Sequence, residues 1–447
     1  MSHIALSSLA AAIFAVPLLA QNASDQLLAN TQGLGLQWPA IGSVKLVTQD
    51  VASCKSTACT TKTEASFQTH NGTNGGAAYD SIRGGVWISN GGKLSCINPD
   101  TCEFICKEEL APFAALGPRE LSPYPQEVGG LAFDAAENTL YMVDARNHEL
   151  HQVRLGSKSD PRACEFRTTK CKIDANMPPG YYPSGLAIDM ARRLLFVASY
   201  DFTSKQSHIY TTPLEKWCSK LCDVTDANGN LPGPCPNLRV AFQGITGLAF
   251  NSCKSVLYVT DGAYTSEMAF AHIPTAKYPC QVKPISCCPV PKTSDADTWR
   301  GLALRPASTT TNGRPCTVKP CSTCPTMVAG FRGDAAMGNF HFALTLSNAP
   351  NETTVAVAAI GFGPCTSGIN VGLCAPLMAN LTGMFTLGVP MNASVASCSS
   401  HGVAPLPIPN DVKLCGLSLS AQWLPICVTP VGVGHGLSNC TSFSVSH

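Results

Sequence analysis

The stretch GLAFD at residues 130–134, followed by LYMVD at residues 140–144, decides the fold class of this chain. Both segments are short and apolar, and residues 135–138 between them favour a turn. Short apolar runs bounded by turn signals are typical of β-strands. The pattern predicts two antiparallel strands here, a third over residues 150–155, and a fourth and outermost strand in the segment that carries Cys164 and Cys171.

The same pattern returns as GLAID at 185–189, GLAFN at 247–251 and a truncated GLAL at 301–304, with a weaker form, GGVWI, at 84–88. The first glycines, at positions 84, 130, 185, 247 and 301, are 46, 55, 62 and 54 residues apart. Such a period indicates one supersecondary unit per repeat. Four antiparallel strands per unit form the blade of a β-propeller. We therefore predict an all-β, disulfide-rich propeller of five blades, or six if a degenerate unit lies within the long insertions.

The two ends of the repeat region are incomplete in complementary ways. Cys54 and Cys59 lie where an outer strand is expected, with no inner strand before them, and residues 301–304 form an inner strand with nothing after it. Joining the two halves in one blade would close the ring. On this interpretation the propeller spans residues 43–306, and residues 21–42 form an N-terminal extension outside it.

The N-terminus and the composition indicate export and exclude some partners. Residues 1–20 contain an apolar run followed by a polar segment, which is typical of a secretory signal peptide, and no later run is long enough to span a membrane. The net charge is +1, and only 13% of the residues are charged, without any basic cluster. A nucleic-acid partner is therefore not expected, because phosphate binding needs clustered Lys and Arg.

The chain has 23 cysteines, a density that makes sense where disulfides persist. Many fall in close pairs, and we expect disulfides that fasten the exposed outer strand of each blade. An odd number leaves at least one thiol free or bonded between chains. Zinc is the alternative at the C-x-x-C of residues 321–324, but no second pair has the spacing of a zinc ribbon. The predicted disulfide cysteines are Cys54, Cys59, Cys102, Cys106, Cys164, Cys171, Cys218, Cys222, Cys280, Cys287, Cys365 and Cys374.

The best repeat, residues 130–150, resembles the NHL-type propeller family. That family has a strand of glycine, hydrophobic residue, alanine, hydrophobic residue and aspartate, then an aromatic strand ending in aspartate, then an asparagine before the third strand. The resemblance covers residues 79–305 and is only partial in the other repeats. Asn251, for example, replaces the first aspartate of its repeat. The resemblance implies a propeller fold without implying one activity.

A second domain is expected after the propeller. Residues 307–324 are predicted to be a cysteine-containing linker, and short alternating strands from residue 325 to residue 447 predict a β-sandwich or jelly roll. The segments 338–350 and 405–439 resemble a C-terminal β-sandwich module of secreted bacterial proteins, over residues 338–445. The resemblance implies an extracellular or surface location, where this domain docks, anchors or assembles.

Two kinds of candidate site follow from the repeat. Asp134, Asp144, Asp189 and Asp261 end predicted strands and could ring one face of the propeller as Ca²⁺ ligands, as in calcium-dependent lactonases and related propeller hydrolases. The alternative is that these aspartates cap turns. His148 and His151 are expected on opposite sides of a strand, which favours a solvated blade surface over a metal site.

Six sequons are candidates for N-glycosylation: Asn22, Asn71, Asn351, Asn380, Asn392 and Asn439. The sequence contains none of the common hydrolase, metalloprotease or nucleotide-binding motifs. We therefore expect a secreted non-enzymatic protein, a scaffold or subunit of an extracellular surface assembly or fibre, without a cofactor, that binds protein partners or copies of itself. The alternatives are a Ca²⁺-dependent propeller hydrolase and an adhesin for surface glycans or proteins.

Overall fold

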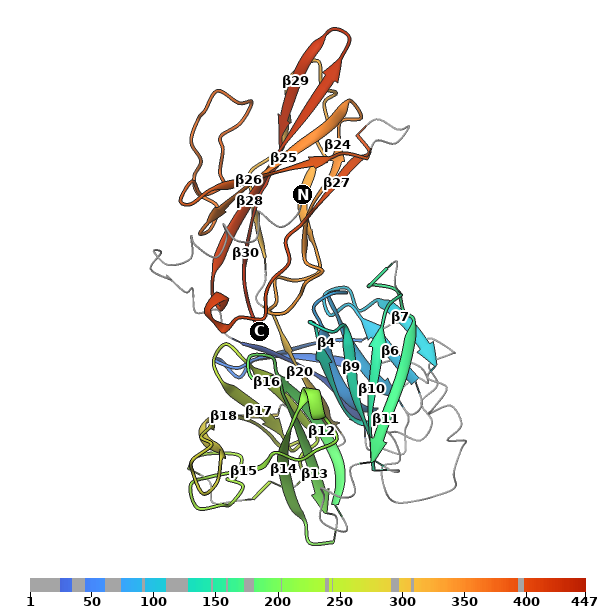
Figure 1. Cartoon of the computed structure of the whole chain (residues 1–447), viewed down its shortest axis with the longest axis vertical. Helices are drawn as coiled ribbons and strands as arrows, with labels where there is room; N and C mark the ends of the chain where they lie inside the picture. Colours follow the sequence, from blue (N-terminus) through green and yellow to red (C-terminus); the bar gives the residue numbers. More distant parts are fainter. Residues whose placement is uncertain are drawn as a thin grey trace. The chain divides into compact units, whose positions relative to one another are not determined.

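The computed structural model describes residues 25–33, 45–60, 74–90, 93–109, 128–145, 148–157, 160–172, 181–201, 203–237, 241–242, 244–290, 297–306, 309–392 and 398–447. The chain forms two compact units. The first is Ser24–Pro306 with Asn410–Val412 and His447, and the second includes Ala307–Pro409 and Lys413–Ser446. Both units consist of β-strands (Figure 1). The predicted signal peptide, residues 1–20, lies outside the described residues.

The first unit contains twenty of the described strands and one short 3-10 helix. They are β1 (Gln26–Gly33), β2 (Lys45–Asp50), β3 (Ser56–Thr60), β4 (Asn74–Asp80), β5 (Gly85–Asn90), β6 (Lys93–Ile97), β7 (Phe104–Glu109), β8 (Val128–Asp134), β9 (Thr139–Asp144), β10 (Glu149–Leu155), β11 (Phe166–Lys172), β12 (Tyr181–Asp189), β13 (Leu194–Asp201), β14 (Gln206–Pro213), η3 (Leu214–Lys216), β15 (Cys222–Thr225), β16 (Gly247–Asn251), β17 (Val256–Thr260), β18 (Tyr264–His272), β19 (Cys280–Pro289) and β20 (Asp297–Arg305).

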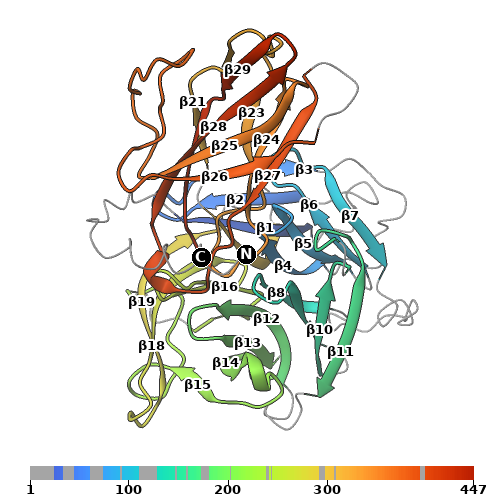
Figure 2. The same ribbon diagram turned by 45° about the horizontal axis from the view of Figure 1, so that its top comes forward.

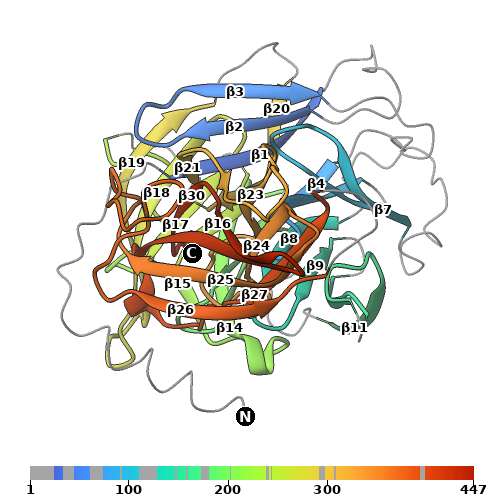
Figure 3. The same cartoon turned by 90° about the horizontal axis from the view of Figure 1, so that it is seen from above.

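These strands form propeller-like sheets of four, each of which we call a blade (Figure 2). Four blades follow the sequence: β4–β7, β8–β11, β12–β15 and β16–β19. The fifth has the order β20-β1-β2-β3, so a C-terminal strand pairs with three N-terminal strands, as the incomplete ends of the repeat predicted. Figure 3 shows β1, β2 and β3 side by side. Parallel pairing of β15 with β19 also joins two blades into one eight-stranded sheet.

Five glycines lie where the inner strands of neighbouring blades meet. A Cβ atom added to Gly130 would lie 2.6 Å from the backbone nitrogen of Leu186, and one on Gly301 would lie 2.4 Å from that of Ala77. The same crowding continues around the ring, because a Cβ at Gly76, Gly185 or Gly247 would meet the next inner strand at 2.5–3.4 Å. The close approach of the inner strands therefore requires glycine at positions 76, 130, 247 and 301, and at Gly185 the fit is tight but less restrictive.

The structure corrects two boundaries of the predicted propeller. The inner strand of the first repeat is β4 with Gly76, whereas Gly84, which we took as its start, lies in the turn between β4 and β5 with a φ of +68°. The spacing from Gly76 to Gly130 is then 54 residues, in line with the other repeats. The predicted extension, residues 21–42, contains β1, and this strand is part of the closing blade because it pairs with both β2 and β20.

Packing between blades supplies most of the core of the first unit. Met142 and Val153 of one blade pack with Trp87 and Cys96 of the preceding blade. Phe196 stacks on Phe250 of the next blade, with ring centroids 4.9 Å apart. Because these side chains are almost completely buried, each blade depends on its neighbours for the burial of its faces.

The second unit contains ten strands and one short 3-10 helix in its described residues. They are β21 (Thr310–Asn312), β22 (Cys316–Thr317), β23 (Val328–Arg332), β24 (Ala343–Ala349), β25 (Thr353–Phe362), β26 (Phe385–Pro390), β27 (Ser400–Pro405), η4 (Val412–Leu414), β28 (Ser418–Thr429), β29 (Gly432–Leu437) and β30 (Cys440–Ser444).

Two sheets of the second unit share one hydrophobic core. The larger sheet contains β21, β30, β28, β25 and β26, with β29 and β22 continuing from β28, and the smaller has the order β23-β24-β27. Leu344 and Leu346 of the small sheet belong to the same buried cluster as Ile360 and Trp423 of the large one. Residues 307–324 are not a linker as predicted, because β21 and β22 lie within them and pair with β30 and β29.

The disulfides of the first unit join different blades. The close pairs do not bond internally as staples of a single outer strand: Cys164 bonds Cys106 of the preceding blade, and Cys171 bonds Cys218 of the next. Such bonds typically stabilise a fold by about 2–4 kcal/mol each. The disulfides are Cys54–Cys288, Cys106–Cys164, Cys171–Cys218, Cys222–Cys280 and Cys235–Cys287 in the first unit, and Cys316–Cys374, Cys321–Cys427, Cys324–Cys398 and Cys365–Cys440 in the second.

The remaining cysteines bear on location and assembly. Cys102, Cys253 and Cys415 are also disulfide-bonded, whereas the side chain of Cys59 lies outside the described residues. Cys96 is the free cysteine of the described part of the chain, and it is completely buried, so it cannot form the bond between chains that the odd number suggested. The many disulfides indicate an oxidising, extracellular type of environment. Within the described residues, no helix is long and apolar enough to cross a membrane.

The glycine ring makes a prediction for stability. The substitution Gly130→Ala should destabilise the protein by about 1–3 kcal/mol, since the new methyl group would press against the backbone of Gly185 and Leu186. Gly388→Ala in β26 is the matched control, because a Cβ there has nothing within 4 Å. Chemical denaturation of both variants measures the difference, and equal stability would contradict the close packing of the inner strands.

Candidate functional site

The structure does not bring the four predicted calcium ligands together. Asp134 and Asp189 end the inner strands β8 and β12, whereas Asp144 ends β9 and Asp261 follows β17. In the antiparallel pair β8–β9, Asp134 is opposite Thr139 and Asp144 is opposite Val128, so the two aspartates lie at opposite ends of the blade. The four residues therefore divide between the two ends of the blades, and they cannot form one ring.

Asp134 and Asp189 stabilise turns and bind arginine. Oδ1 of Asp134 accepts a hydrogen bond from the backbone N–H of Ala136, and its carboxylate pairs with Arg193 at 2.7 Å. Asp189 in turn accepts the N–H of Ala191 and pairs with Arg192 at 2.7 Å. Both carboxylates are completely buried and occupied by these partners. This is the turn-capping role that we considered as the alternative to calcium.

The residues that end the inner strands β4 and β16 also cap turns. Asp80 in the β4–β7 blade caps the turn through the N–H of Ile82 and binds Arg83 at 2.7 Å, a role that the sequence analysis missed because the strand was misplaced. Asn251 replaces the aspartate in the β16–β19 blade, and its side chain accepts the N–H of Lys254. Asp261 likewise accepts the N–H groups of Ala263 and Tyr264 in its own loop.

A cluster of three metal-binding side chains lies instead on the β9–β10 hairpin. Asp144, Glu149 and His151 each offer a ligand atom, and these atoms lie within 4.8 Å of one another. Nε2 of His151 is 3.4 Å from Oε2 of Glu149. The three residues are only 2%, 8% and 2% exposed, respectively. We call this set the hairpin cluster. His151 is thus buried, and the expected solvated surface does not apply to it.

Two features set the charge of the hairpin cluster. Burial lowers the pKa of His151, and this effect outweighs the opposing attraction of Asp144 and Glu149, so the imidazole is neutral at neutral pH. Lys170 of β11 places Nζ 3.0 Å from Oε2 and 3.1 Å from Oε1 of Glu149. The lysine is 59% exposed along its side chain, so its ammonium group reaches the buried carboxylate from the solvent side.

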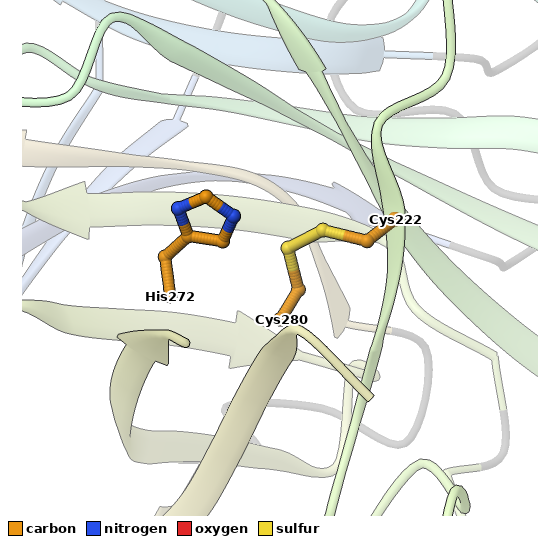
Figure 4. A group of neighbouring side chains, drawn as sticks. All are labelled: Cys222, His272 and Cys280. Carbon is orange, nitrogen blue, oxygen red and sulfur yellow. A yellow bond between two sulfur atoms is a disulfide. The ribbon is translucent and has the colours of Figure 1, made fainter. Parts of the chain in front are cut away.

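A second group with metal-ligand chemistry contains Cys222, His272 and Cys280 (Figure 4). The two sulfur atoms are joined in a disulfide, and the imidazole of His272 lies beside it. Oγ1 of Thr211 is 3.3 Å from each sulfur. A disulfide has no thiolate to offer, so this group is a cross-link between β15 and β19 and binds no metal unless it is reduced.

The β12–β15 blade carries a simpler group of similar residues. Nε2 of His208 is 2.7 Å from Oδ1 of Asp223, and Nζ of Lys220 is 2.6 Å from the same oxygen. Burial raises the pKa of Asp223, but the hydrogen bonds from His208 and Lys220 outweigh it and hold the pKa below its usual value. With a single carboxylate, this group is an ion pair and provides a natural comparison for the hairpin cluster.

The sequons differ in accessibility. Asn439 is buried, and its Oδ1 accepts the backbone N–H of Ala329, so it is not an accessible glycosylation site in the folded protein. Asn392 is exposed, and Asn351 and Asn380 are partly buried. Asn22 and Asn71 lie outside the described residues.

Comparisons with known proteins identify no family. No known protein-family profile matches the sequence, and no curated protein matches it. Among solved structures, a protein from Lactobacillus plantarum is 8% identical with a TM-score of 0.31, covering 92% of this chain and 93% of its own. Hydrazine synthase of Kuenenia stuttgartiensis is 10% identical with a TM-score of 0.29, covering 50% and 70%. The β-propeller domain of Cps50 (Swd1) from Myceliophteria thermophila is 8% identical with a TM-score of 0.32, covering 57% and 74%.

The turn-capping role of the inner-strand aspartates is testable. The substitution Asp134→Asn should lower the free energy of unfolding by about 2–3 kcal/mol, because it removes the charge that pairs with Arg193. Asp261→Asn is the control, since asparagine also caps loop N–H groups. Urea unfolding of both variants measures the effect. A stability of Asp134→Asn equal to the wild type, together with a loss of Ca²⁺ binding, would restore the calcium interpretation.

Proposed function

We propose that this protein is a secreted, non-enzymatic scaffold: a five-bladed propeller that carries a β-sandwich, through which copies of the chain associate into an extracellular assembly. The observation that carries this proposal is the surface of the second unit. From residue 335 to the end of the chain, Glu352, Asp411 and Lys413 are the only Asp, Glu, Lys or Arg residues. Charge of one sign is a main force that keeps soluble proteins apart, and this stretch nearly lacks it. The other charged residues of the second unit, Arg314, Lys319, Arg332 and Asp334, all precede it.

The β28–β29 hairpin adds exposed apolar surface to this weakly charged stretch. Val428, Val431 and Val433 are 54%, 86% and 69% exposed, and Val428 is opposite Val433 in the hairpin register. A contiguous group of exposed aliphatic side chains is typical of interaction sites. We call these three valines the hairpin tip. Association through it would bury apolar area that a monomer leaves in water.

The first unit supports the scaffold role through its cross-links. Disulfides connect the β4–β7 blade to the β8–β11 blade, then to the β12–β15 and β16–β19 blades, and finally to the closing blade. Bonds of this kind oppose separation of the blades and suit a durable extracellular component. The alternative of a calcium-dependent hydrolase loses its main argument, since its four aspartates divide between two ends of the blades.

Replacing apolar side chains at the hairpin tip tests the proposal. The double substitution Val431→Lys and Val433→Lys should keep the protein monomeric at concentrations where the wild type associates, because two ammonium groups would have to be desolvated at the contact. Ile285→Lys, at a 49% exposed position of β19, is the matched control and should associate like the wild type. Sedimentation velocity over a range of concentrations measures association.

Three results would contradict the proposal. The first is a wild type that remains monomeric at every concentration, and the second is a double variant that associates as strongly as the wild type. The third is binding of the wild type to neutral phospholipid vesicles without association in solution, which would assign the hairpin tip to a lipid surface.

A further inference from the structure

We propose that the hairpin cluster of Asp144, Glu149 and His151 is a binding site for a divalent transition metal of the Zn²⁺ type. This inference is independent of the assembly proposed above, because it concerns the first unit and not the hairpin tip. It also differs from the calcium ring expected from the sequence, because only Asp144 belongs to both sets and the ligands come from one hairpin.

The register of the hairpin brings the three ligands together. Asp144 at the end of β9 is directly opposite Glu149 at the start of β10. His151 is two residues further along β10, so its side chain is on the same face of the strand as that of Glu149. Because all three ligands belong to adjacent antiparallel strands, the backbone holds them close together before any metal binds, which reduces the entropy lost on binding.

The donor set indicates the kind of metal. One imidazole nitrogen and two carboxylate oxygens are ligands that Zn²⁺ accepts in tetrahedral sites with three protein ligands and one open position. Ca²⁺ prefers six to eight oxygen ligands and does not match a set that contains nitrogen.

Lys170 is one group that a metal at this site would displace. Its ammonium group binds both oxygens of Glu149 and supplies one positive charge to a site with two buried carboxylates. A divalent cation offers more charge at the same carboxylate, and the largely exposed lysine side chain can turn into solvent. The lysine is therefore a competitor of the metal, and its removal should raise metal affinity.

The site lies on a face that packs against another blade. Met142 is two residues from Asp144 and Val153 is two residues from His151, so both share the face of the cluster. Both also belong to the core shared with Trp87 and Cys96 of the β4–β7 blade. Burial by that blade keeps the cluster away from bulk water, which strengthens electrostatic attraction for a cation. The metal would connect β9 and β10 at the edge of this contact and stabilise the folded protein.

Calorimetric titration of the chelator-treated full-length protein with ZnCl₂, without reductant, tests the proposal. We expect one Zn²⁺ per chain, an increase in the melting temperature on binding, and a visible absorption band when Co²⁺ replaces Zn²⁺. Omitting the reductant keeps the disulfide Cys222–Cys280 intact, so the group around His272 cannot contribute. Titration with CaCl₂ should give no comparable binding.

Variants assign the binding to these residues. Glu149→Gln and His151→Asn should each weaken binding by at least about 10-fold, the range seen even for residues that only support metal ligands. The matched control is His208→Asn, which removes a histidine from a group with one carboxylate and one lysine and should leave binding unchanged. Lys170→Met should strengthen binding, and it removes no ligand, so it keeps the test informative if the other variants fold poorly.

The opposite results would overturn the proposal. These are no Zn²⁺ binding by the wild type, an affinity unaffected by Glu149→Gln in a folded variant, or an affinity reduced by Lys170→Met. Loss of binding in His208→Asn would instead place the metal at the neighbouring blade. The assembly proposal is tested separately, because the hairpin-tip variant should bind Zn²⁺ like the wild type.

Discussion

The contact between neighbouring inner strands at five glycines is the constraint on which the first unit depends. At Gly76, Gly130, Gly247 and Gly301 the backbone of the next inner strand leaves no room for a Cβ atom, and at Gly185 a Cβ would lie 3.4 Å from that backbone. The last contact, from Gly301 to Ala77, joins the C-terminal strand to the first complete blade. Closing the ring therefore requires both the repeated glycine and the pairing of β20 with β1.

The disulfides join neighbouring blades at the outside of the unit, as the inner-strand contacts do near its centre. Glycines set the distance between blades near the inner strands, and the cystines hold adjacent blades together at β7, β11, β15 and β19. Since the hydrophobic clusters also span two blades, no blade has a complete core of its own. The hairpin cluster lies at one of these contacts, where a bound cation would add a further link.

Much of the fold could be predicted from the sequence, because the GLA repeat marks four of the five inner strands, β8, β12, β16 and β20. The first blade was misplaced because its inner strand, β4, lacks this signature, and β1 was missed because its sequence is largely polar. Cysteine pairing depends on which blades are adjacent, so spacing alone could not show it. The hairpin cluster could have been predicted from two signals taken together. Glu149 and His151 are two residues apart on one strand, and Asp144 lies opposite Glu149 across the hairpin.

Peptide mapping of the non-reduced protein tests the central claim, that disulfides hold successive blades together around the closed ring. Trypsin separates Cys164 from Cys171 at Arg167 and Lys170, and it separates Cys218 from Cys222 at Lys220. Mass spectrometry should find the peptide of Cys106 linked to that of Cys164, and the peptide of Cys171 linked to that of Cys218. A peptide in which Cys164 is linked to Cys171 would contradict this account.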